Sequence, residues 1–233
     1  MKRIIIIAFV LVVCKGYAQQ TYNYFDATAG VAKYQGSFSL AFVHNWQLGA
    51  SRKFEVGVGG RFTSYIAANQ YYVTAPAELT SESTSPFIIF KDNVTANMDT
   101  FLVKSPQINS LNLSIHLGYQ LGKKISAGFN IDAIGLSFGG SRSGNYINGP
   151  VGKVTTATPT TFNLLLVSDN DRGSLNSEFY LRYAVRGPWS VKFGAQFLFT
   201  EYTTATKVQQ FPQENDRFRN KSLLFCIGVG YKF

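Results

Sequence analysis

Histidines are the side chains best suited to acid–base chemistry near neutral pH, and this sequence has only His44 and His116. Nucleophilic catalysis needs a serine or cysteine beside a histidine, and an acid to orient that histidine. His44 alternates with Phe42 and Trp46 on an apolar face, whereas His116 follows Ser114 on a polar face. Neither histidine has both a serine and an acid at a recognisable spacing, so we predict that the chain is not an enzyme.

Metal and cofactor chemistry has no sequence signal either. The sequence contains no metal-ligand cluster, no glycine-rich phosphate loop and no Cys/His pair. The two cysteines are Cys14, in an N-terminal apolar run, and Cys226, near the C-terminus. Because we expect the segment with Cys14 to be removed, we predict no disulfide in the mature chain. We also predict no metal and no cofactor.

Charged residues form the second chemically interesting set, because they occupy polar positions in segments that alternate with apolar residues. Three acids and three bases belong to this set, namely Glu55, Asp132 and Glu178 with Arg61, Arg182 and Lys192. Buried charges are costly unless they are paired. The equal numbers of acids and bases therefore predict a mutually neutralising, structural network inside the fold.

These charges must be positioned by β-strands, because apolar residues recur at every second position through much of the chain. Eight segments show this alternation, at Tyr22–Val31, Ser37–Trp46, Lys53–Tyr65, Ser110–Gln120, Ile125–Ala133, Leu175–Val185, Val191–Phe199 and Leu223–Phe233. The alternation changes phase near Ile134–Leu136, which predicts a β-bulge there.

The last segment carries the most specific signal. Phe233, Tyr231 and Val229 lie on an apolar face, opposite a small or polar face, and the chain ends on Phe233. This ending resembles the closing strand of bacterial outer-membrane β-barrels, in which the terminal aromatic residue is part of the signal read by the insertion machinery. The glutamines Gln19 and Gln20 and the Asn/Tyr/Thr-rich loops resemble small barrels of the Bacteroidota. The resemblance implies an all-β, eight-stranded antiparallel up-and-down transmembrane β-barrel with long extracellular loops, in the bacterial outer membrane.

Short turns and long connections alternate along the chain, as they do in outer-membrane barrels. The short turns lie near Ala50, Gly122 and Gly187, and the long connections are residues 67–107, 139–173 and 201–220. If the last strand ends in the periplasm, the short turns are periplasmic and the long loops are extracellular. An ascending strand must then precede Ser37, and Tyr22–Val31 completes the eight.

Aromatic and basic residues gather at the ends of the strands beside the short turns. Five aromatic residues are expected to form an interfacial girdle: Trp46, Tyr119, Trp189, Tyr231 and Phe233. Basic residues of the turns would meet lipid head groups or simply be solvated, and these are Arg52, Lys53, Lys123, Lys124 and Arg186. Outer-membrane lipids are therefore expected partners.

The N-terminus has the order of a secretory signal. A basic start, an apolar run and small residues follow one another in Met1–Arg3, Ile4–Val13 and Gly16–Ala18. We predict a signal peptide over residues 1–18 and a single barrel domain over residues 19–233. A lipid on Cys14 is disfavoured, because Val13 before it is not a small residue.

The net charge does not indicate a nucleic-acid partner. The chain carries a formal charge of +9, and removal of Lys2, Arg3 and Lys15 with the signal peptide leaves +6. The basic residues are scattered and form no stripe interleaved with aromatic residues, so we predict no binding of nucleic acid.

Three functions remain open. The first is a plugged barrel with a surface-structural or loop-mediated binding role, in which loop aromatics contact an extracellular ligand or protein; they are Tyr71, Tyr72, Tyr146, Phe162, Tyr202 and Phe211. The second is a narrow channel or transporter for small solutes, and the third is a lipid-modifying enzyme. A secreted β-sandwich is the competing fold.

Overall fold

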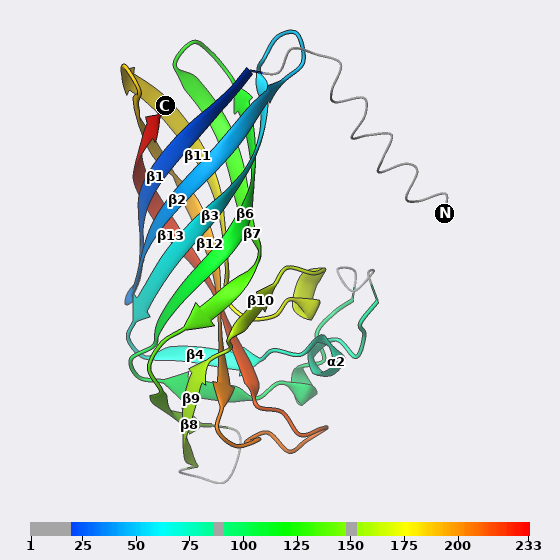
Figure 1. The fold of residues 1–233 in the computed structure, drawn as a ribbon. Coiled ribbons are helices and arrows are strands. Elements are labelled where there is room, and N and C mark those ends of the chain that lie inside the picture. The colour runs from blue at the N-terminus through cyan, green and yellow to red at the C-terminus, as the bar shows by residue number, and fades with distance from the viewer. Residues whose placement is uncertain (1–19, 86–90, 148–152) are drawn as a thin grey trace.

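The computed structural model describes residues 20–85, 91–147 and 153–233, which form a narrow β-barrel that continues at one end into a folded cap (Figure 1). Thirteen strands in these ranges belong to one sheet. Eight of them are long: β1 (Gln20–Ala32), β2 (Gln35–Leu48), β3 (Phe54–Ala67), β6 (Gln107–Gln120), β7 (Ile125–Phe138), β11 (Leu175–Arg186), β12 (Trp189–Thr204) and β13 (Arg217–Lys232). The predicted signal peptide, residues 1–18, lies outside the described residues.

The long strands pair in chain order, each antiparallel to the next, and β13 pairs with β1 to close the ring. Every long strand therefore has two partners and no open edge. The predicted all-β antiparallel fold is confirmed. Each predicted segment matches one long strand, with Lys53 and Phe233 one residue outside β3 and β13, but the sheet also contains five short strands that the alternation did not reveal.

The two faces of the barrel follow the two-residue rhythm of its strands. Along β12, Phe193 and Phe197 point outward and are about half exposed, whereas Lys192 and Gln196, the residues just before them, are buried. Alternation of side chains across a strand produces this pattern when one face lines the interior. The barrel is therefore apolar outside and polar inside.

A β-bulge in β7 keeps the apolar residues of this strand on the outer face. Leu113 pairs with Ile134 and Ser114 pairs with Asp132, so Ala133 is an extra residue in β7. The bulge lies one residue before the predicted region. It restores Ile134 to the outer face, where it is exposed, while Asp132 remains buried inside.

One end of the barrel, here called the turn end, carries three short turns at residues 49–53, 121–124 and 187–188. Gly49 and Gly187 adopt positive φ angles of 75° and 57° in these turns, a conformation that suits glycine. The opposite end carries long connections, with one exception. Lys33 and Tyr34 alone join β1 to β2 there, so the alternation of short turns with long loops is not strict.

The long connections, which the sequence predicted as loops, contain short strands and helices and fold into the cap. The cap consists of residues 68–85, 91–106, 139–147, 153–174 and 205–216, with the far ends of β6, β12 and β13. Its elements are β4 (Gln70–Thr74), α2 (Ala77–Thr80), η3 (Thr95–Asn97), β5 (Thr100–Val103), β8 (Arg142–Tyr146), β9 (Val154–Pro159), β10 (Phe162–Leu164) and η4 (Ser168–Asn170). No helix in the described part of the chain is long and apolar enough to cross a membrane.

The cap contains a second closed ring of strands. Beyond the barrel, β12 pairs with β9, and the pairing continues through β8, β5 and β4 to β13, which pairs back with β12. The interior of this ring is apolar. Its cap core consists of Tyr72, Phe101, Val103, Ile108, Tyr146, Ala157, Tyr202, Val208 and Phe218.

Candidate functional site

A network of charges fills the middle of the barrel, with Arg61 of β3 in one half of it. Its guanidinium donates from Nε to Asp132 Oδ1 at 2.8 Å and from Nη1 to Asn130 Oδ1, and its Nη2 donates to the Asn176 backbone oxygen. Asp132 is fully buried and also accepts a hydrogen bond from Asn112 Nδ2 at 2.7 Å. Every nitrogen of the Arg61 guanidinium thus has a fixed acceptor.

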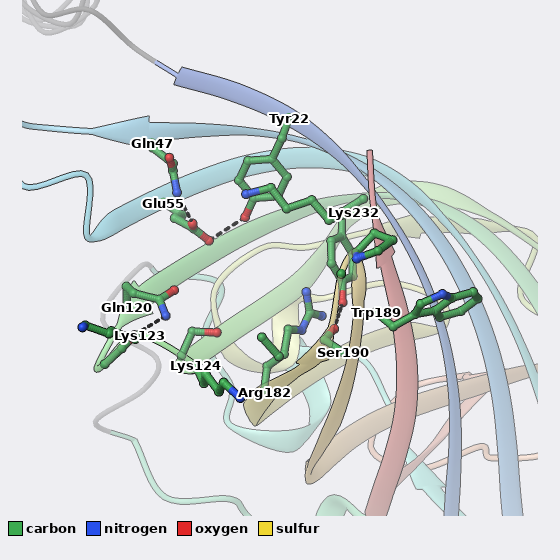
Figure 2. A pocket seen from close by; sticks show the side chains of 16 residues that line it. Tyr22, Gln47, Glu55, Gln120, Lys123, Lys124, Arg182, Trp189, Ser190 and Lys232 are labelled. Atoms are coloured by element: carbon green, nitrogen blue, oxygen red, sulfur yellow. Dashed lines mark hydrogen bonds between the residues drawn. The ribbon is translucent and has the colours of Figure 1, made fainter.

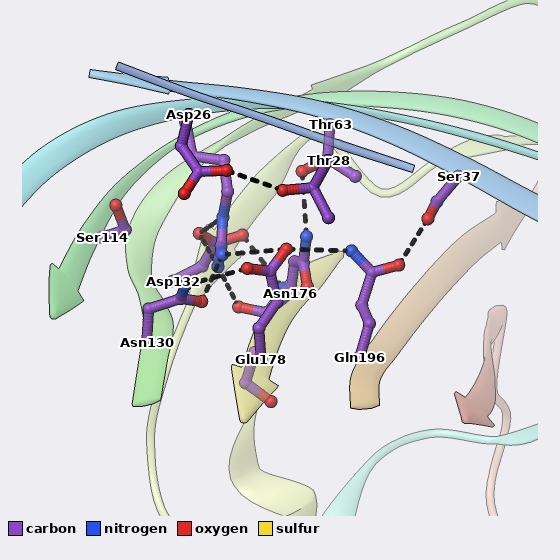
Figure 3. Close-up of polar contacts among 12 residues, drawn as sticks. Asp26, Thr28, Ser37, Thr63, Ser114, Asn130, Asp132, Asn176, Glu178 and Gln196 are labelled. Carbon is purple, nitrogen blue, oxygen red and sulfur yellow. Dashed lines mark hydrogen bonds and ion pairs between the residues drawn. The ribbon is translucent and has the colours of Figure 1, made fainter. Parts of the chain in front are cut away.

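Lys192 of β12 joins the other half of the network. Its Nζ lies 2.6 Å from Glu178 Oε2 and 3.0 Å from Asp26 Oδ1, and Arg182 pairs with the other oxygen of Asp26. Asn130 donates to Glu178 at 3.0 Å and so connects the two halves (Figure 3). Three acids and three bases are therefore paired, which offsets the cost of burying them.

The structure brings together five of the six predicted network residues and replaces the sixth. Glu55 lies near the turn end, where it accepts hydrogen bonds from Tyr22 Oη at 2.7 Å and Gln47 Nε2 at 2.8 Å, and it forms no ion pair with a described residue. Asp26 takes its place. Asp26 lies in the most weakly patterned strand, although the alternation Phe25, Ala27 already put it on the inner face.

The interior leaves little room between these side chains. A space of about 10 Å³ lies between the two halves of the network, and another of about 30 Å³ lies beside His116 and Tyr180, toward the turn end. One water molecule needs at least about 10–15 Å³ of such volume. Each of these two spaces is therefore water-sized.

A wider cavity of about 330 Å³, here called the vestibule, opens at the turn end (Figure 2). Four residues line both the vestibule and the smaller space below it and so form the floor, namely Tyr22, Tyr24, Glu55 and Arg182. The Arg182 guanidinium lies 3.9 Å from the centre of the Tyr24 ring, and Lys232 Nζ lies 3.6 Å from the centre of the Tyr22 ring. Cations over aromatic rings line two sides of the opening.

The predicted girdle residues all lie near the turn end, and the structure brings four of them into ring contacts. The Trp189 and Tyr231 rings lie 4.9 Å apart, and the Tyr231 and Phe233 rings 6.0 Å apart. Trp46 packs edge-on against His44 at 4.6 Å. Tyr119 is exposed at the end of β6. In Figure 2 the Trp189 ring points away from the vestibule, toward the outer surface.

The two histidines do not form catalytic arrangements. His44 Nδ1 lies 2.8 Å from Asn23 Oδ1, and His116 Nε2 lies 2.9 Å from Ser114 Oγ. Among the described residues neither histidine forms an ion pair with an acid. No group of three potential metal-ligating residues is found in the same ranges. A serine beside a histidine without an orienting acid is an incomplete triad.

The cap core accounts for half of the aromatic residues that the sequence assigned to ligand-binding loops. Tyr72, Tyr146 and Tyr202 are buried in the second ring, where the Tyr72 and Tyr202 rings lie 5.2 Å apart. Burial and the hydrogen bond to Asp99 raise the pKa of the Tyr146 hydroxyl. The other three remain accessible: Tyr71, Phe162 and Phe211.

A second ion cluster fixes the cap onto the outside of β12 and β13. Glu201 is fully buried and accepts from Arg217 Nε and Arg219 Nη2, both at 2.8 Å. Lys221 Nζ lies 2.6 Å from Asp169 Oδ1, and Arg219 also donates to the Asp171 backbone oxygen. Burial raises the pKa of the Asp171 carboxyl group. These contacts hold the segment around η4 against the two strands, so ion pairs and hydrogen bonds fix this part of the cap in place.

Comparison with known proteins gives a resemblance of fold. No protein-family model matches the chain, and no curated protein sequence matches it. Among solved structures it is similar to Neisserial surface protein A, with 12% identity over 93% of this chain and 100% of that chain and a TM-score of 0.40. It is also similar to the Yersinia pestis outer membrane protein Ail, with 8% identity over 92% and 100% and a TM-score of 0.37. A major outer membrane protein from Thermus thermophilus has 12% identity over 92% and 100%, with a TM-score of 0.38. These values are low, so location and function are argued from the geometry of the chain itself.

Proposed function

We propose that the chain is an integral protein of the bacterial outer membrane, an eight-stranded up-and-down transmembrane barrel with a plugged polar interior. Its cap has a surface-structural or binding role on the extracellular side. The observation that carries this proposal is the outer face of the closed ring. In the barrel part of β13 that face consists of Leu223, Phe225, Ile227, Val229 and Tyr231, whose side chains carry no charge. A closed barrel with an apolar outer face satisfies its backbone internally, as a lipid environment requires.

The length of this apolar face along the strands also supports a location in the membrane. The outward positions of β12 are uncharged from Trp189 to Phe199, and the next outward residue is Glu201. Eleven residues of a tilted strand span a bilayer. Lys221 precedes the uncharged run of β13 and lies beside Phe199, with Nζ 5.8 Å from the centre of its ring. The membrane boundary on the cap side is therefore assigned to this level.

The partners follow from this placement. The outer-membrane lipids contact the apolar face, and the aromatic girdle marks the periplasmic interface at the turn end. The strand β13 and its terminal Phe233 are the signal for the insertion machinery. Exposed cap residues such as Tyr71 and Phe211 are available to an extracellular ligand or protein. The signal peptide of residues 1–18 delivers a single domain, residues 19–233, to this location.

The two other functions receive less support. A channel requires a continuous path through the interior, whereas the spaces beside the ion network hold only water-sized volumes. A lipid-modifying enzyme requires an acid at His44 or His116, whereas the side chains that form hydrogen bonds with those rings are Asn23 and Ser114. A plugged, non-enzymatic barrel fits both observations.

Cysteine labelling on intact cells tests the location and the orientation together. In a Cys226→Ser background, Phe211→Cys places a thiol on the cap and Lys123→Cys places one on a short turn. A maleimide that does not cross membranes should label the cap thiol on intact cells, and the turn thiol only after the outer membrane is permeabilised. Labelling of the turn alone on intact cells would reverse the orientation. Recovery of the protein in the soluble fraction would refute the membrane location.

A further inference from the structure

The vestibule is lined mainly by cations. Four basic residues and one acid contribute to its walls: Lys123, Lys124, Arg182 and Lys232, with Glu55. The formal net charge of these five side chains is +3. Glu55 does not offset the cations through direct pairing, since its two oxygens accept from the neutral donors Tyr22 and Gln47. Because Arg182 is paired with Asp26, the cations of the vestibule that have no ion pair among the described residues are its lysines, Lys123, Lys124 and Lys232.

Two interior arginines differ in how fully they are satisfied. Arg61 donates to Asp132, Asn130 and the backbone oxygen of Asn176, so each of its three nitrogens has an acceptor. Arg182 pairs with Asp26 through Nη2, while its Nε is buried and has no acceptor among the described residues. A buried donor without a partner costs free energy until an acceptor arrives. Arg61 belongs to the plug, whereas Arg182 retains donor capacity at the floor of a cavity.

Lys232 is a second cation of the vestibule and lies in its wall. Its Nζ lies over the Tyr22 ring, and it forms no ion pair with any residue that the structure describes. Figure 2 shows Lys232, Tyr22 and Arg182 around the same opening. An anion between the lysine and the arginine would lie against two cations and leave the plug paired, because Asp26 also pairs with Lys192.

We propose that the vestibule is a binding site for a small molecule bearing a phosphate group, which Arg182 holds from the floor and Lys232 from the wall. Arginine is suited to this role, because its planar guanidinium makes strong charge-assisted hydrogen bonds to phosphate. The cavity of about 330 Å³ is at the lower end of the usual range for ligand sites. The site is independent of any binding by the cap. The phosphate comes either from a soluble ester or from the head group of a phospholipid at the rim.

Calorimetric titration of the purified full-length protein with glycerol 3-phosphate, in a neutral detergent at fixed ionic strength, tests the site. The wild type should bind saturably. Arg182→Gln should weaken binding by about tenfold or more, the loss expected when a charge-assisted hydrogen bond is removed. Lys232→Gln should weaken it as well, and it gives a second reading if Arg182→Gln folds poorly. Arg186→Gln is the matched control, because it removes the same charge at the same end from a residue that does not line the vestibule.

Native mass spectrometry with phosphatidylglycerol separates the two sources. Saturable binding of glycerol 3-phosphate identifies a soluble ester as sufficient. Retention of phosphatidylglycerol by the wild type and Arg186→Gln, but not by Arg182→Gln, without binding of the soluble probe, identifies a lipid head group. Binding of neither probe overturns the proposal. Equal losses in Arg182→Gln and Arg186→Gln also overturn it, because they would show general attraction to a basic end.

Discussion

The barrel and the cap share the strands β12 and β13, but the interior of the barrel is polar and the interior of the cap is apolar. Inside the barrel, β12 contributes Lys192 and Gln196, and a few residues later it contributes Tyr202 to the cap core. β13 changes in the same way, with Phe218 in the cap core. The outer face of β12 changes in the opposite sense, from the apolar Phe193 on the barrel to the buried acid Glu201 under the cap. The phase of the strands is constant, so the surroundings decide which residue type occupies which face.

This contrast has a physical reason. In the membrane location proposed above, the outer face of the barrel meets hydrocarbon, so the hydrophobic effect does not favour an apolar interior there. Its interior is held instead by hydrogen bonds and paired charges. The cap is surrounded by water and must bury apolar side chains in the usual way. The two rings should therefore respond differently to the same kind of substitution.

The largest effect is expected inside the barrel. Arg61→Met should destabilise the protein by about 3–5 kcal/mol, because it leaves Asp132 buried without its charged partner. Urea unfolding in lipid vesicles measures the loss. The double variant Arg61→Met/Asp132→Asn is the control and should be more stable than Arg61→Met alone. Equal or additive destabilisation in the double variant would mean that the charges do not act as a pair.

A core truncation in the cap should have a somewhat smaller and local effect. Phe218→Ala removes a fully buried ring that packs 5.6 Å from Phe101. A cost of about 3 kcal/mol is expected, and hydrogen exchange should rise in β4 and β5 while the barrel strands stay protected. Phe225→Ala, on the outer face of the same strand, should leave the cap unchanged. Faster exchange throughout the barrel in Phe218→Ala would mean that the rings unfold as one unit.

A charge on the outer faces distinguishes lipid from water. Ile227→Lys on the barrel should cost about 2 kcal/mol, at the lower end of the range for the membrane midplane because lysine can extend toward the interface. Thr158→Lys, on the exposed face of β9, should change stability by less than about 0.5 kcal/mol. Unfolding of both variants in the same vesicles gives the comparison. Similar costs at the two positions would remove the assignment of lipid to one face and water to the other.

The smallest effect is expected for an exposed ion pair of the cap. Lys207 Nζ lies 3.0 Å from Glu214 Oε2, with side chains 57% and 60% exposed. Lys207→Ala should cost less than about 0.5 kcal/mol, as is usual for exposed pairs. Glu201→Gln should cost more in the same assay, because it weakens a buried cluster. The reverse order would contradict the assigned role of Glu201 in fixing the cap.

The long strands were predictable from the sequence because one of their faces is uniformly apolar. The alternation in the predicted segment Leu223–Phe233 survives the apolar inward residue Leu224, and the change of phase near Ile134 marked the bulge at Ala133. Glu55 was assigned wrongly to the network for a different reason. Alternation gives the side of the strand, but not the height at which a side chain meets its partners.

The cap was not predictable in the same way. Its strands have three to six residues, too few for a period to stand out. Their partners are distant in the sequence, as with Phe101 and Tyr146. Neighbouring aromatic residues therefore looked equivalent, although Tyr71 is exposed and Tyr72 is buried. Only the closure of the second ring distinguishes them.

Conductance across a planar lipid bilayer tests most directly whether the ion network seals the barrel. The purified full-length protein is inserted into the bilayer, and current is recorded over a range of voltages. The paired charges and water-sized spaces predict no steady openings. Steady, ohmic openings of the wild-type protein would contradict a sealed interior.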